Sequence, residues 1–142
     1  MHIRQKIRNN LKTLLTGLTD TGDRVYMNRV YPLDKQNGIL IFTNSEDTQY
    51  LTMGDPRSQE RTYSVKIEIF VKGISNYDGK IDDISVEIEH AIANDRTLSG
   101  IASDTMITGF SSEFGAEGDV PVGVGTLTLM VKYLTTENSI EV

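Results

Sequence analysis

The side chains that most often carry acid–base, nucleophilic or metal chemistry are scarce in this sequence, which contains two histidines and no cysteine. Without cysteine, disulfides, thiolate metal sites and cysteine nucleophiles are excluded. His2 lies at a terminus that is expected to fray, and His90 lacks a second histidine at the spacing of a zinc-binding helix. We therefore interpret His90 as an ordinary surface or partly buried helix residue.

A group of carboxylates has the residue type that binds calcium, and it consists of Asp78, Asp82, Asp83 and Glu87. An EF-hand loop alternates its oxygen ligands and places glycine at the sixth position, whereas NYDGKIDDISVE has Gly79 fourth and Lys80 fifth. The segment is therefore a poor calcium loop. Helix capping and the attraction of acids to a helix N-terminus explain these residues more simply.

Glycines at positions 115, 118, 123 and 125 resemble those of a phosphate-binding loop only in composition. Such loops lead from a strand into a helix, whereas these glycines lead into the strand-like sequence TLTLMVKYL. The sequence has neither a GK[ST] motif nor the GxSxG motif of a nucleophile elbow. We expect a hairpin connection here, and no enzymatic activity, cofactor or metal site in the protein.

Two helices are predicted from apolar residues that recur every three or four positions. The first spans residues 2–16, where Gly17 and the turn sequence TDTGD end it. The second is expected to begin at Asp78, as its N-terminal cap, and to end near Asn94. Their apolar positions are Ile3, Ile7, Leu11, Leu14, Leu15 and Leu18, and Ile81, Ile84, Ile88, Ala91 and Ile92.

Five strands are predicted from alternation or from short apolar runs, over residues 25–30, 38–43, 61–73, 105–113 and 123–135. The sequence EFGAEGDVPVG between the last two is expected to be an exposed, mobile loop. Strands in adjacent hairpins with helices apart from them indicate an α+β fold, with a mainly antiparallel sheet and both helices on one face. The 142 residues are expected to form one domain, spanning 1–142.

Residues 44–59 are too long for an ordinary structureless loop, so we predict a projecting arm or β-hairpin around them. Its centre carries Tyr50, Leu51 and Met53, which are apolar and need a partner. The partner is either another protein or the core of the same domain, and the sequence leaves both open.

The overall charge is −6, which argues against general binding to nucleic acid. The first twelve residues are an exception, because they contain four basic residues and no acid: Arg4, Lys6, Arg8 and Lys12. This segment is either a solvated helix face or a surface for an acidic neighbour, including another copy of the chain. No apolar run approaches the roughly 18 residues of a membrane span, and the N-terminus has no signal-peptide core, so we expect a protein made and used in a cytoplasm.

The order of elements resembles the tail-terminator family of long-tailed bacteriophages, called minor tail protein U, and more loosely the tail-completion and head–tail joining proteins. The resemblance covers nearly the whole chain. It rests on an amphipathic helix, a short strand, a turn with proline, the strand GILIFTNSED, a long arm, the strand RTYSVKIEIFVKG, the helix DDISVEIEHAI and a final hairpin.

This resemblance implies a structural virion protein that forms a ring, expected to be a hexamer, and is assembled in the host bacterial cytoplasm. The ring would cap the tail tube, end its polymerisation and present its other face to the head–tail connector, with DNA only as passing cargo and no membrane partner. The alternatives are another connector or tail-completion protein, or a soluble binding module that acts as a monomer or dimer.

Three groups of residues follow as candidates for these contacts. The arm, with Tyr50, Leu51, Met53 and Arg57, is assigned to a neighbouring subunit or the tail tube, because apolar anchors dominate interfaces. A second interface group pairs with an acidic patch across the subunit boundary and comprises Arg4, Arg8 and Lys12. A third group faces the lumen, where negative charge lets DNA pass without binding, and comprises Glu113, Glu117 and Asp119.

Overall fold

The structure is a computed structural model that describes the chain except for residues 29, 31, 33, 74 and 118–119, and that describes only the backbone of residues 116–117. In chain order its elements are α1 (Ile3–Leu15), β1 (Val25–Tyr26), β2 (Asn37–Tyr50), β3 (Ser58–Lys72), α2 (Tyr77–Asn94), β4 (Asp104–Glu117) and β5 (Val120–Thr136).

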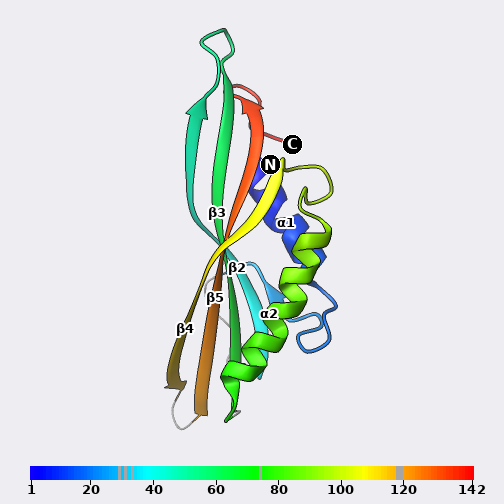
Figure 1. The fold of residues 1–142 in the computed structure, drawn as a ribbon, viewed down its shortest axis with the longest axis vertical. Helices are drawn as coiled ribbons and strands as arrows, with labels where there is room; N and C mark the ends of the chain where they lie inside the picture. Colours follow the sequence, from blue (N-terminus) through cyan, green and yellow to red (C-terminus); the bar gives the residue numbers. More distant parts are fainter. Residues whose placement is uncertain (29, 31, 33, 74, 118–119) are drawn as a thin grey trace.

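These strands form one twisted five-stranded sheet in the order β1-β2-β3-β5-β4 (Figure 1). The β1–β2 pair is parallel, and the other three pairs are antiparallel. Both helices cover the same face of the sheet. The predicted α+β fold is confirmed.

The core lies between the two helices and the sheet face that they cover. Strand β3 supplies every second side chain from Tyr63 to Val71 to this face, and all five are fully buried. The helices supply the apolar stripes that their periodicity predicts: Ile3, Ile7, Leu11 and Leu15 from α1, and Ile81, Ile84, Ile88 and Ile92 from α2. Each large apolar side chain buried in this way stabilises the fold by roughly 1.5–3 kcal/mol.

The predicted arm is a β-hairpin that continues the sheet beyond the helices. Strand β2 runs on to Tyr50, which pairs with Gln59 of β3, so the strand is longer than the expected residues 38–43. Beyond its apolar start, β2 becomes polar and exposed, which concealed its second half as a strand. Strand β1 differs in the other direction, because it has two residues where residues 25–30 were expected.

The last hairpin is also longer than predicted, so the expected loop over EFGAEGDVPVG is wrong for most of its residues. Strand β4 continues to Glu117, and β5 begins at Val120. Gly123 and Gly125 lie inside β5, where an added Cβ would lie 2.7 Å from Tyr77 and 2.5 Å from Ile81 of α2. These glycines therefore mark a close approach of a helix to the strand, which is a recognised use of glycine in strands.

Helix α2 begins at Tyr77, and its cap is Asn76, which is two positions before the expected cap Asp78. The Asn76 side chain accepts a hydrogen bond from the backbone N–H of Gly79 at 3.3 Å. Asp78 lies in the first turn, where its charge favours the helix dipole. The helix ends at Asn94, as predicted.

Candidate assembly surfaces

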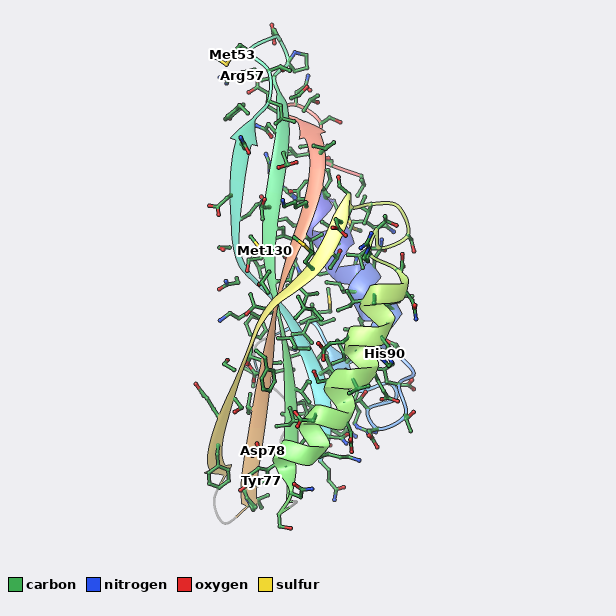
Figure 2. The ribbon with its side chains drawn as sticks, in the orientation of Figure 1. Met53, Arg57, Tyr77, Asp78, His90 and Met130 are labelled. Carbon is green, nitrogen blue, oxygen red and sulfur yellow. The ribbon has the colours of Figure 1, made fainter. Side chains whose placement is uncertain are left out.

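The tip of the β2–β3 hairpin is an exposed apolar surface at one end of the molecule (Figure 2). The exposed fractions are 48% for Tyr50, 51% for Leu51 and 86% for Met53. The sequence left open whether these side chains pack on the core of their own domain. The structure excludes that alternative, because all three are exposed. Their assignment to a partner stays a prediction.

Arg57 holds the base of this tip. Its guanidinium lies 4.6 Å from the centre of the Tyr50 ring, and its Nη2 lies 2.9 Å from Oε2 of Glu137, which follows β5. The hydrogen bond from Arg57 lowers the pKa of Glu137 below its ordinary value. Arg57 therefore has a role inside the chain, where it orients Tyr50, and a direct contact with a partner stays a prediction.

An open groove of about 720 Å³ lies beside the arm. Its apolar lining includes Ile3, Leu51, Leu134 and Val142, of which Leu134 is 60% and Val142 57% exposed. Sequence reasoning missed Leu134 and Val142. A signal for Leu134 was present in the alternation of β5. Tyr133 points into the core, so the next residue, Leu134, points to the opposite face, where a large apolar side chain is exposed.

Of the basic residues of α1 assigned to an interface, Arg4 and Arg8 are bonded within the chain, whereas Lys12 is exposed. Arg4 pairs with Glu46, while Nη1 of Arg8 donates hydrogen bonds to Thr43 Oγ1 at 2.8 Å and to the Tyr63 hydroxyl at 2.7 Å. These bonds hold α1 against the part of β2 from which the arm of its own chain extends. Lys12 is exposed in the last turn of α1.

Glu46 accepts more than one partner at the point where the arm leaves the body. Its side chain is 10% exposed and also lies 3.3 Å from Nη1 of Arg61, while the Tyr133 hydroxyl donates to its other oxygen. Burial, and then this hydrogen bond, raise the pKa of Tyr133 above its ordinary value. The cluster joins α1, β2, β3 and β5.

Of the three residues predicted to face a lumen, the structure describes the side chain of one. Glu113 is exposed on β4, on the sheet face that the helices leave open. Burial raises the pKa of Glu68 on β3, and the negative charge of Glu113 raises it further, so the two carboxylates lie on the same face. The side chain of Glu117 and all of Asp119 lie outside the described residues.

A second set of exposed apolar residues lies along β4, which runs towards the end of the molecule opposite the arm tip (Figure 1). Phe110 is 49% and Phe114 65% exposed, and the Phe114 ring stacks on Tyr77 of α2 with 4.9 Å between ring centres. Figure 2 shows Tyr77 and Asp78 at this end. Sequence reasoning singled out neither phenylalanine: Phe110 lies in the strand predicted over residues 105–113, and Phe114 lies in the segment that was expected to be a loop.

Comparisons with known proteins add little to this description. No family model matches the sequence, and no curated protein matches it. Among solved structures, the chain is similar to a chain from the "Virion of native gene transfer agent (GTA) particle", with a TM-score of 0.36, 12% sequence identity and 92% of each chain covered. Similarity at this level assigns neither a family nor a function.

The acidic residues and histidines first considered for metal binding lie apart in the described structure. Within the described residues, no three or more histidine, aspartate or glutamate side chains are placed to hold a metal ion. His90 is exposed on α2 and points away from the core (Figure 2). None of the helices described here is both long and apolar enough to span a membrane.

Proposed function

We propose that the protein is a structural component of a bacteriophage-type virion, and that it acts by binding other copies of itself and other virion proteins, without catalysis. One observation carries the proposal. A two-stranded arm projects beyond the helices and ends in Leu51 and Met53, whose side chains are exposed to solvent (Figure 1). Exposed apolar side chains on a projecting element are typical of a surface that a partner covers.

The specific role that we propose is that of a tail terminator. A ring of copies, six in this proposal, binds the last ring of the tail tube, ends its polymerisation and offers its other face to the head–tail connector. The match between the predicted and observed order of elements supports this role. A ring of identical subunits forms when one surface binds a different surface on the next copy and rotation closes the set.

The arm provides the test. Leu51→Ser combined with Met53→Ser, introduced into the gene in its own phage or particle, should give tails of irregular and greater length in electron micrographs. The urea midpoint of the purified variant should match that of the parent, because both side chains are exposed. Val30→Ser, which alters another exposed apolar residue, is the matched control and should leave tail length unchanged.

Tails of normal length in the double variant would contradict an assembly role for the arm. Tails of normal length that lack heads would instead favour another connector or tail-completion role. The groove of about 720 Å³ beside the arm favours a third candidate function, a soluble binding module. Light scattering distinguishes this module from a terminator, because a module stays monomeric or dimeric both alone and with the tail tube protein, whereas a terminator forms larger assemblies.

A further inference from the structure

Within the part of the chain that the structure describes, two strand segments of the sheet have no strand on their outer side. Strand β1 pairs only with Ile39 and Leu40, so no described strand pairs with the outer side of β2 over residues 44–50. On the other side, β4 is the last strand, and its residues 109–115 are exposed. An unpaired strand edge offers backbone donors and acceptors to another chain.

The two edges run in opposite directions. Strand β2 is antiparallel to β3, β3 to β5, and β5 to β4, so β2 and β4 are antiparallel to each other. If two copies stand side by side in the same orientation, β4 of one copy therefore meets β2 of the next as an antiparallel pair. That is the pairing already used by the three long strand pairs inside the chain.

Three basic residues lie along one side of α1, and the first two of them are bonded to β2. Arg4, Arg8 and Lys12 are spaced four residues apart on α1 and form what we call its basic flank. The bonds of Arg4 to Glu46 and of Arg8 to Thr43 show that this part of the flank faces β2, and Lys12 follows them, exposed, one turn further along α1. The other side of α1 faces α2, because Asn10 donates a hydrogen bond to the Leu98 carbonyl at 2.8 Å.

A line of negative charge lies over the β4 edge. Asp78, Asp82 and Glu89 are exposed on one side of α2 and form what we call its acidic flank. Asp82 and Glu89 line a hollow with Phe110 of β4, so this flank faces the free edge of β4. The opposite side of α2 faces the loop that follows α1, where Lys80 pairs with Asp20 at 2.7 Å.

We infer that copies of this chain join head to tail, with the free edge of β4 beside the free edge of β2 in the next copy, and with the acidic flank of α2 facing the basic flank of α1. The partner is a second copy of this chain, chosen by the opposite charges over two edges of opposite direction. The inference rests on the ring assembly of the proposed function. It specifies which surfaces form the joint.

This joint has two consequences for a ring. The free half of β2 lies towards the arm and β4 lies towards the other end, so joined copies are offset along the strands (Figure 1). Such an offset is what closing a sheet into a barrel requires. With the helices of all copies on the outside, the open sheet face that carries Glu113 faces the lumen.

Charge reversal tests the joint. Lys12→Glu and Asp82→Lys should each raise the dissociation constant for self-association by about tenfold or more at low salt, measured by analytical ultracentrifugation. The two variants mixed together should associate more tightly than either alone, because an altered α1 flank meets an altered α2 flank. Lys6→Glu and Asp83→Lys are matched controls, since they change exposed residues of the same types on other faces of the same helices, and should have little effect.

Cross-linking tests the same joint inside an assembly. Because the chain has no cysteine, Lys12→Cys combined with Asp82→Cys introduces the only thiols. A bismaleimide should link copies of this variant into a ladder, in concentrated solution or in isolated tails, whereas Lys6→Cys with Asp83→Cys should give no ladder. Circular dichroism and urea unfolding show that each variant is folded.

The outcomes are separable from those of the proposed function. Absence of the ladder in assemblies that contain the protein, equal effects of the control variants, or a chain that never self-associates would overturn the joint. A ladder together with normal tails after loss of the gene would support the joint and overturn the terminator role. If the arm variant alters tail length but the cysteine variant gives no ladder, the proposed joint is overturned and the terminator role is not.

Discussion

The hydroxyl of Tyr133 donates a hydrogen bond to the carboxylate of Glu46, although the two residues are 87 positions apart in the chain. Arg4 and Arg61 pair with the same carboxylate. One partly buried acid therefore ties the first helix and three strands together at the base of the arm. Any surface that the arm offers to a partner is oriented through this cluster.

Glu46→Ala should reduce the free energy of unfolding by about 2–4 kcal/mol, because it leaves Arg4, Arg61 and the Tyr133 hydroxyl without their shared acceptor. Urea unfolding followed by circular dichroism measures the change. Asp47→Ala is the matched control, since Asp47 is exposed on the same strand, and should change stability by less than about 0.5 kcal/mol. Equal effects of the two variants would show that the cluster does not stabilise the fold.

Tyr133 should make the protein less stable at alkaline pH. Its pKa is raised in the folded state above the ordinary value of 10.0, so its contribution is fully present below about pH 10 and is lost as the pH rises through the folded pKa. Thermal unfolding between about pH 8 and pH 11 should therefore show a smaller loss for Tyr133→Phe than for the parent. Parallel curves for the two proteins would contradict this prediction.

Gly125→Ala should reduce stability by about 1–3 kcal/mol, because the new methyl group would lie 2.5 Å from Cγ2 of Ile81 and force α2 away from β5. Gly115→Ala is the control, since no atom lies within 4 Å of the corresponding position on β4. Urea midpoints of the two variants give the comparison. A stable Gly125→Ala variant would mean that α2 moves freely against the sheet.

Glu113→Lys should reduce the yield of infectious particles while tail length stays normal, because a positive charge on the open sheet face would bind the passing DNA. Titre and electron microscopy of the same preparation measure the two quantities. Asp83→Lys places the same charge change on the outer side of α2 and should leave the titre unchanged. A normal titre with Glu113→Lys would exclude Glu113 from the lumen wall.

Local patterns in the sequence were sufficient for the helices and for β3. Alternation and helical periodicity depend on residues within a few positions of each other, and most of the apolar side chains that they select are buried in α1, β3 and α2, whereas Leu14, Leu18 and Ala91 are partly buried. They were insufficient where a strand is polar and exposed. The second half of β2 and the end of β4 are held as strands by hydrogen bonds to β3 and β5, which no local pattern records.

The sequence by itself determined the fold class, the order of elements and the existence of an arm, because these depend on which residues are apolar and how they are spaced. Only the tertiary structure decided where the charges lie. It bonds Arg4 and Arg8 to the chain's own β2, leaves Lys12 exposed, and sets the acidic side of α2 over β4. Strand order and helix orientation make that choice, because they bring together residues that are far apart in the chain.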